Sequence, residues 1–367
     1  MKYVGNVQSQ ANSEVYATAS GALPNGKPVV VNSNGTVSVI AGIAAGVGSA
    51  VTFNNANTFD TSSVFDSNSN KVIVAYRDVG QSQHGYAVVG TVSGTSISFG
   101  TPVEFENAVI ASVGIGFDSN LNKVLIVYKD EGNSNYGTSI VGTVSGTNIS
   151  FGTPVVYSSA NTSSQTATFD SNSNKMVVAY KEGAKVGTIS GTGISYGSAA
   201  TFSPSGSNAS FIAMCFDSNS NKLVVSFRPQ SDNHGYTAIG TVSGTSISFG
   251  TAVKFNYAVT SAINNTFDSN SNKVVVAYDN DGNSSYGTAI VGTVSGTSIS
   301  FGSPVVFKTA ESNVSQNGAF NTETNTVVLA FASSGTLAII EGTVSGTSIS
   351  FGSEVTATGV SAGNPVT

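Results

Sequence analysis

The sequence FDSNSNK at Phe65–Lys71 is repeated along the chain and decides the fold. It returns as FDSNLNK at Phe117–Lys123, as FDSNSNK three more times, and in a degraded form, FNTETNT, at Phe320–Thr326. Successive copies are 52, 52, 47, 51 and 53 residues apart. A second phrase, GTVSGTSISFG, begins at Gly90 and recurs in phase with the first. A period near 50 residues indicates a propeller or a solenoid.

Each repeat reads as four short antiparallel strands, named a to d in chain order. Strand a, as in Ala111–Phe117, is rich in small residues, and strand b, as in Val124–Tyr128, is almost entirely apolar, which is typical of a strand covered on both faces. Strand c follows, as in Thr138–Val144. Strand d alternates at Ser96–Phe99 until Pro102 interrupts it, which predicts an outer edge. Small residues inside and proline outside predict an all-β fold, a single propeller of four-stranded antiparallel blades, with a solenoid as the alternative.

The N-terminal residues offer a further, divergent blade. Lys27–Val31 reads as strand b, Thr36–Ile40 as strand c, and Ser49–Phe53 (SAVTF) resembles the end of strand d in the repeats. Strand a of this blade is either Val15–Gly21 or the C-terminal Gly363–Thr367. The second choice would close the ring by pairing the two ends of the chain. We therefore expect seven blades.

This interpretation divides the chain into three parts. Residues 1–56 form the leader and the first blade, residues 57–357 form the six explicit repeats, and residues 358–367 form a tail that is a candidate ring-closing strand. Met1–Ala11 has no apolar stretch of the kind found in a secretory signal, and no apolar run reaches the roughly 18 residues of a membrane span.

Two sets of loop residues repeat over a longer period of three blades. Phe65 and Phe216 are 151 residues apart, and both arginines and both histidines of the chain fall at matching places in these two repeats. Loops between strands b and c share one face of a propeller, so the two sets are predicted to form two sites on one rim, far apart across the ring. Arginine with histidine and tyrosine can hold a carboxylate or sugar hydroxyls, whereas the alternative is a purely structural loop. The candidate ligand-binding residues are Arg77, Asp78, His84 and Tyr86 in the first set and Arg228, Asp232, His234 and Tyr236 in the second.

The Asp-Ser-Asn-Ser-Asn turns place oxygen donors at alternate positions, as in Asp66, Asn68 and Asn70. This spacing is the first half of a calcium-binding loop, but Lys71 stands where that loop needs glycine, and no glutamate completes it. The alternative is a hairpin turn capped by the aspartate side chain. We expect no metal site and no other cofactor.

Composition narrows the function further. Only 9% of the residues are charged, the net charge is −6, and arginine is scarce, which argues against a nucleic-acid partner or an anionic membrane surface. The single cysteine excludes an internal disulfide framework. A sialidase-like site would need three arginines, and the chain has two. No strand-to-helix context for the G-x-S-x-G elbow of a serine hydrolase is present. Glycoside hydrolysis would need two acids near the channel, but most acids lie in turns or at loop tips. We therefore expect that the protein is not an enzyme.

Two long segments resemble a known family. YKDEGNSNYGTSIVGTVSGTNISFGTPVVY, beginning at Tyr128, and YDNDGNSSYGTAIVGTVSGTSISFGSPVVF, beginning at Tyr278, are similar to a propeller repeat in predicted structural proteins of marine tailed phages, including tail-fibre-like proteins. SGALPNGKPVVVNSNGTVSVI, beginning at Ser20, resembles a segment near the start of such proteins. The resemblance implies a virion component that touches the host, and it carries over no catalytic residue.

The sequence thus predicts a non-catalytic, lectin-like or adhesion propeller of a virion or extracellular surface. Its expected partners are a host-surface glycan or protein and other virion proteins, without nucleic acid and without membrane insertion. The alternative is a purely structural virion module. Binding is favoured because the DSNSNK and GTVSGTS turns hardly vary, whereas the loops of the opposite face differ in length and charge.

Overall fold

The computed structural model describes residues 48–311, 317–333 and 336–361, together with five short strands near the start of the chain. The chain divides into two compact units, Met1–Gly46 and Val47–Thr367. Among the described residues, no helix has the length and the hydrophobicity needed to cross a membrane.

The described residues of the first unit form two small sheets. Its described strands are β1 (Lys2–Val4), β2 (Glu14–Tyr16), β3 (Thr18–Ala19), β4 (Val29–Val31) and β5 (Thr36–Val39). β1 pairs with β2, while β5 lies between β3 and β4. The antiparallel pairing of β4 with β5 matches the predicted strands b and c, but their sheet belongs to this separate unit.

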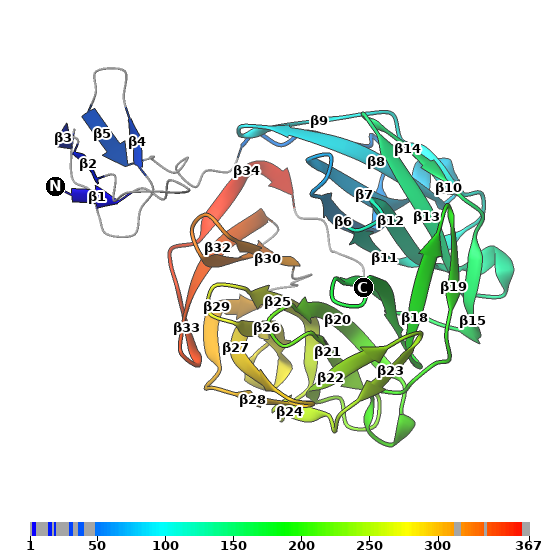
Figure 1. Cartoon of the computed structure of the whole chain (residues 1–367). Coiled ribbons are helices and arrows are strands. Elements are labelled where there is room, and N and C mark those ends of the chain that lie inside the picture. The colour runs from blue at the N-terminus through cyan, green and yellow to red at the C-terminus, as the bar shows by residue number, and fades with distance from the viewer. Residues whose placement is uncertain are drawn as a thin grey trace. The chain divides into compact units, whose positions relative to one another are not determined.

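The second unit is a ring of six antiparallel sheets, one for each sequence repeat (Figure 1). The protein is therefore an all-β, six-bladed propeller, and the expectation of seven blades is wrong. No α-helix occurs among the described residues. The short 3-10 turns there are η1 (Val79–Gln81), η2 (Glu131–Asn133), η3 (Pro204–Gly206) and η4 (Asp281–Asn283).

The blades are numbered in chain order. Blade 1 consists of β6 (Thr58–Asp66), β7 (Lys71–Asp78), β8 (His84–Ser93), β9 (Ser96–Phe99) and β10 (Val103–Glu106). Blade 2 consists of β11 (Ile110–Asp118), β12 (Lys123–Asp130), β13 (Tyr136–Ser145), β14 (Asn148–Phe151) and β15 (Val155–Asn161). Blade 3 consists of β16 (Thr166–Asp170), β17 (Lys175–Tyr180), β18 (Gly183–Ser190) and β19 (Gly193–Tyr196).

The second half of the ring repeats this order. Blade 4 consists of β20 (Ala209–Asp217), β21 (Lys222–Pro229), β22 (Gly235–Ser243), β23 (Ser246–Phe249) and β24 (Val253–Asn256). Blade 5 consists of β25 (Thr260–Asp268), β26 (Lys273–Asn280), β27 (Tyr286–Ser295), β28 (Ser298–Phe301) and β29 (Val305–Glu311). Blade 6 consists of β30 (Asn317–Asn321), β31 (Thr326–Ser333), β32 (Thr336–Ser345), β33 (Ser348–Phe351) and β34 (Val355–Ser361).

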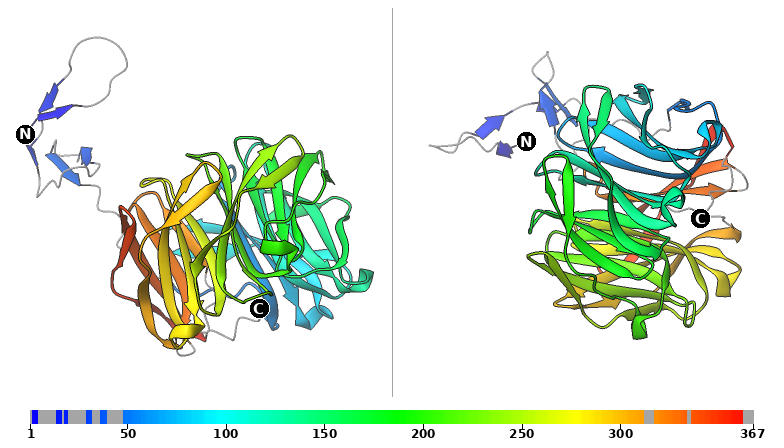
Figure 2. Two further views of the ribbon diagram at one scale, coloured as in Figure 1. Left: turned by 90° about the horizontal axis from the view of Figure 1, so that it is seen from below. Right: turned by 90° about the vertical axis from the view of Figure 1, so that its right-hand side faces the viewer.

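Strands a to d follow one another outwards from the centre of the ring, as predicted (Figure 1). In the side views of Figure 2 the strands run between the two faces of the propeller. The outer edge is divided: in blade 1, β9 pairs with one half of β8 and β10 pairs with the other half, with Pro102 between them. The predicted interruption of the edge strand is confirmed. Blade 3 differs, because its second outer strand is reduced to a bridge between Ala184 and Ala200.

The hydrophobic core lies between neighbouring blades. At the junction of blades 1 and 2, the ring of Phe105 packs on Tyr128 and Phe151, with ring centroids 5.3 and 5.8 Å apart. Such tilted or edge-on pairs contribute about 0.5–1.5 kcal/mol each beyond the burial of their area. The same three-ring contact recurs at the next four junctions, where the leading rings are Tyr157, Phe202, Phe255 and Phe307.

A glycine and a threonine meet at each of these junctions. The glycine that ends the SFG or SYG segment lies against the backbone carbonyl of the threonine in the next SGT turn, and a Cβ atom there would collide with that oxygen. Only glycine permits so close an approach. The pairs are Gly100–Thr147, Gly152–Thr192, Gly197–Thr245, Gly250–Thr297 and Gly302–Thr347.

The sixth junction, on the free side of blade 1, is filled by a segment from the start of the second unit. Gly48 lies against the carbonyl of Thr95, just as the other glycines do. The ring of Phe53 packs on Tyr76 and Phe99, with centroids 5.1 and 5.7 Å apart. The segment thus makes the sixth copy of both contacts on blade 1, and we infer that it closes the ring without adding a blade.

The last repeat explains why this segment is needed, because Ala357 stands at its aromatic position. Ser49–Phe53 is not the outer strand of a seventh blade and forms no strand. It resembles the end of strand d because it fills the same place against the next blade. Of the two candidates for strand a of a seventh blade, Gly363–Thr367 lies outside the described residues, and the described part of Val15–Gly21 belongs to the first unit.

Candidate functional site

Each predicted set of residues lies at the rim formed by the loops between strands b and c, but it separates into an inner and an outer group. Arg77 and Arg228 lie near the end of strand b and pair there with strand a, toward the centre of the ring. Tyr86 and Tyr236 pair with strand b on one side and with the outer strands β10 and β24 on the other. Among the described residues, no hydrogen bond or ring contact joins the side chains of the arginines to those of the histidines and tyrosines.

In the inner group, Arg77 neutralises a buried acid. Its Nε atom lies 2.9 Å from Oδ2 of Asp60, whose side chain is only 6% exposed, and Nη1 donates to Oε1 of Gln83 at 3.2 Å. Burial raises the pKa of Asp60, and the Arg77 guanidinium opposes this rise. The guanidinium also lies 5.2 Å from the ring centroid of Phe59. These contacts leave Arg77 little freedom to meet a ligand.

Arg228 has a different set of inner contacts. Its Nε atom donates to Oγ of Ser210 at 3.2 Å, and Nη1 donates to the carbonyl oxygen of Thr260 at 3.3 Å. Its guanidinium carbon lies 4.3 Å from the ring centroid of Phe211. Because Thr260 belongs to blade 5, Arg228 ties two blades together.

The outer group of blade 1 is organised by a glutamate. Nδ1 of His84 lies 2.7 Å from Oε1 of Glu104, and the hydroxyl of Tyr86 donates to the same oxygen at 3.3 Å. A carboxylate only accepts, so Nδ1 of His84 carries the proton. Asp78 takes no part in this group: its Oδ1 accepts the N–H of Gly80 at 2.8 Å and caps η1.

The outer group of blade 4 has a lysine at the matching place. Nζ of Lys254 lies 3.1 Å from Oδ2 of Asp232 and 2.7 Å from Nδ1 of His234. Asp232 also accepts the hydroxyl of Tyr236 at 2.7 Å and the backbone N–H of His234 at 3.1 Å. Nδ1 of His234 also lies 3.2 Å from Oδ2 of Asp232, so it meets both an ammonium, which only donates, and a carboxylate, which only accepts. The histidine of blade 4 therefore differs from His84, whose Nδ1 meets a carboxylate alone.

The charges of this network support one another. Partial burial disfavours the charge of Asp232, but hydrogen bonds from Tyr236, His234 and Lys254 hold its pKa below the ordinary value. The hydrogen bond with Tyr236 raises the pKa of Lys254 most, and the carboxylate of Asp232 raises it further. Both groups therefore remain ionised at neutral pH.

An exposed aromatic ring borders this network. Tyr257 is 77% exposed, the highest value among the large hydrophobic side chains that the structure describes. Its ring centroid lies 5.2 Å from Nζ of Lys254 and 6.5 Å from that of His234. We call Asp232, His234, Tyr236, Lys254 and Tyr257 the blade 4 cluster.

Sequence reasoning missed three of the residues that shape the outer groups, namely Glu104, Lys254 and Tyr257. A comparison of the repeats could have found the first two, because other blades carry valine or threonine at that place, as in Val156 and Thr201. In the same comparison, the residue of blade 1 that is equivalent to Tyr257 is Asn107, so the two copies of the site differ in this aromatic side chain.

The Asp-Ser-Asn turns on the opposite face are capped by their aspartates. Oδ1 of Asp66 accepts the N–H groups of Asn68 and Ser69 at 2.9 and 3.0 Å, and its Oδ2 accepts the hydroxyl of Ser69 at 2.6 Å. Lys71 donates to Oγ1 of Thr91 at 2.8 Å instead of neutralising the aspartate. The described residues contain no group of three or more His, Cys, Asp or Glu side chains placed to hold a metal ion.

Comparison with known proteins defines the class and no more. No protein-family model and no curated protein matches the chain. A crystal structure of a protein from Lactobacillus plantarum is similar with a TM-score of 0.57 at 12% identity, over 92% of this chain and 94% of that chain. The β-propeller domain of Cps50 (Swd1) from Myceliophteria thermophila gives a TM-score of 0.50 at 11% identity, over 83% and 89% of the two chains. The chain is a β-propeller protein.

Proposed function

We propose that this protein is a non-catalytic binding propeller of a virion or other extracellular surface, and that it contacts a host-surface glycan through the blade 4 cluster. The observation that carries the proposal is the exposed ring of Tyr257 beside a charged hydrogen-bonding network. An exposed aromatic ring offers a flat apolar face on which a ligand can pack, with polar groups beside it.

The chemistry of the cluster suits a sugar. A pyranose presents an apolar C–H face, which can pack on the ring of Tyr257, and hydroxyls on its edge. Lys254 can donate to those hydroxyls, Asp232 can accept from them, and the ring of His234 can form a further hydrogen bond. Apolar surface with a few fixed polar groups is the usual composition of a small-ligand site.

The extracellular setting is supported by the sequence. The segments beginning at Tyr128 and Tyr278 resemble a propeller repeat of phage structural proteins, including tail-fibre-like proteins. On this proposal, other virion proteins are the remaining partners.

A purely structural module is the second candidate, and the repeated contacts favour it. The SGT turns serve as docking points for the preceding blade, as in Gly100–Thr147, and the DSN turns cap hairpins, so the invariance of both needs no ligand. The blade 4 cluster is what this candidate leaves unexplained.

The test is binding to an array of host-derived glycans, followed by titration of the best ligand. We expect Lys254→Met to weaken binding about tenfold or more, because a charged hydrogen bond contributes about 1.5–3 kcal/mol. Tyr257→Ala should weaken binding severalfold or more, because it removes the apolar face on which the sugar packs. His234→Ala should weaken binding, whereas His84→Ala, its matched control in blade 1, should not. Absence of binding to any glycan would favour the structural module. Equal losses in the two histidine variants would contradict the assignment to blade 4.

A further inference from the structure

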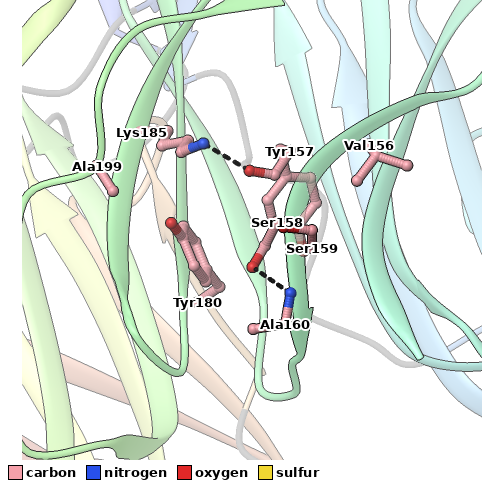
Figure 3. A pocket seen from close by; sticks show the side chains of 8 residues that line it. All are labelled: Val156, Tyr157, Ser158, Ser159, Ala160, Tyr180, Lys185 and Ala199. Atoms are coloured by element: carbon pink, nitrogen blue, oxygen red, sulfur yellow. Dashed lines mark hydrogen bonds between the residues drawn. The ribbon is translucent and has the colours of Figure 1, made fainter. Parts of the chain in front are cut away.

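A pocket of about 460 Å³ lies between blades 2 and 3, away from the blade 4 cluster. Figure 3 shows its lining, to which β15 contributes Val156, Ser158 and Ser159, while blade 3 contributes Tyr180 and Lys185. Its volume falls within the range of about 300–1,000 Å³ that is typical of small-ligand sites.

The pocket follows from the shape of blade 3. Its strand c, β18, has 8 residues, whereas β13 of blade 2 has 10, because the loop between strands b and c is short. Its second outer strand is reduced to the bridge between Ala184 and Ala200. Ala200 stands where the repeats of blades 2 and 5 carry Val155 and Val305, so less side chain fills this edge.

Lys185 stands at a position that is apolar in every other repeat. The residue two places before the conserved glycine of strand c is buried in the other five blades, where it is Val88, Ile140, Ala238, Ile290 or Ile340. Lys185 is only partly buried at this position, and packing between the blades does not require an ammonium there. This departure points to a use for the ammonium group.

The polar groups of the pocket have unused hydrogen-bonding capacity. Lys185 donates one hydrogen bond, to the carbonyl oxygen of Tyr157 at 2.7 Å, and among the described residues it has no ion pair (Figure 3). An ammonium has three donors, so two remain. The hydroxyl of Tyr180 has no partner among the described residues, and burial, aided by the nearby Glu182, raises its pKa to about 12, so it remains a donor at neutral pH.

Glu182 lies three residues before Lys185 in the sequence, and its carboxylate has another partner. The carboxylate of Glu182 accepts the hydroxyl of Thr162 at 3.1 Å and does not line the pocket. The hydroxyl groups of Ser158 and Ser159 complete the polar wall, and Val156 and Ala199 supply the apolar one. The pocket therefore presents one ammonium group without an ion pair among the described residues, together with hydroxyl groups and a small apolar surface.

We propose that this pocket binds a small organic carboxylate, with Lys185 and Tyr180 holding the carboxylate oxygens. Phosphate-sized anions without a carbon skeleton would leave the apolar wall uncovered. The proposal stands apart from the glycan site of blade 4, so neither depends on the other.

The experiment measures binding to the full chain by ligand-observed NMR and calorimetric titration. It compares D-glucuronate with D-glucose, which lacks the carboxylate. Propionate serves as a second carboxylate. We expect saturable binding of glucuronate, and binding of glucose that is weaker by about tenfold or more. Lys185→Met should reduce glucuronate binding about tenfold or more, and Tyr180→Phe should reduce it severalfold.

Lys181→Met is the matched control. Lys181 also donates to a backbone carbonyl of blade 2, that of Asn161 at 3.4 Å, but it does not line the pocket, so its loss removes an equal charge without touching the site. Unchanged melting temperatures would show that the variants fold. Equal binding of glucuronate and glucose, equal losses in the two lysine variants, or no saturable binding of glucuronate and propionate would each overturn the proposal.

Discussion

Phe53→Ala should weaken the whole propeller, although the residue lies outside every strand. The ring of Phe53 packs on Tyr76 and Phe99 of blade 1, and it supplies the junction contact that the last repeat lacks. Its removal would leave the first blade uncovered on one side. Every other junction also has a continuous peptide between its two blades.

The size of the effect can be worked from the contacts. A phenylalanine ring buries about 150–250 Å² when enclosed, and taking half of this for the partly buried Phe53 gives about 2–3 kcal/mol at about 25 cal/mol per Å². The two ring pairs, with centroids 5.1 and 5.7 Å apart, raise the expected loss to about 3–6 kcal/mol. For a unit of this length the melting temperature should fall by about 5–9 °C.

The assay is differential scanning calorimetry, with urea unfolding as a second measurement. Val51→Ala is the matched control, because Val51 lies in the same segment and is 43% exposed, so its loss should change stability by less than about 0.5 kcal/mol. Phe105→Ala, at a junction within the ring and 6% exposed, should cost about 3–5 kcal/mol. If Phe53→Ala unfolds like Val51→Ala, the segment does not close the ring.

Two further changes test the junctions and the blade 4 cluster. Gly100→Ala should lower the free energy of unfolding by about 2 kcal/mol or more, because its Cβ collides with the carbonyl of Thr147. Gly193→Ala is the control: its Cβ would lie 3.7 Å from the nearest oxygen, so it should change the free energy of unfolding by less than about 1 kcal/mol. Similar urea midpoints for the two variants would contradict the close-contact argument. Asp232→Asn should destabilise the protein at neutral pH, because a carboxylate whose pKa is lowered on folding adds stability above its ordinary value of 3.8 and loses it as the pH falls through the folded pKa. A difference in unfolding free energy that is the same at neutral and at strongly acidic pH would refute this account.

The blade pattern could be predicted because it depends on local chemistry repeated many times. The apolar run of strand b and the placement of Pro102 each report burial or edge position directly, and the strands lie where these features placed them. The number of blades could not be predicted in the same way. Ser49–Phe53 copies only the last part of a repeat, and a packing surface without a strand has the same apolar pattern as a strand end.

The candidate site was predicted only in part, because spacing along the chain does not give distance from the centre of the ring. Arg77 and His84 lie close in sequence, yet one pairs with strand a and the other approaches β10. Lys254 lies on the outer strand β24 and Tyr257 lies just after it, about 20 residues after His234 in the sequence. Both come close to His234 only because β24 pairs with β22. Lys185 was detectable, since it breaks an apolar column of the repeat alignment.

Closure by a single segment also determines how the propeller responds to force. The polypeptide passes from Met1–Gly46 directly into Gly48–Phe53, so tension applied through the first unit reaches the ring at its closing contact before it reaches any strand. That contact consists of one ring and one close backbone approach, whereas each blade is held by ladders of hydrogen bonds. A pull from the N-terminal side would therefore detach this segment before it separates the strands of any of the six sheets.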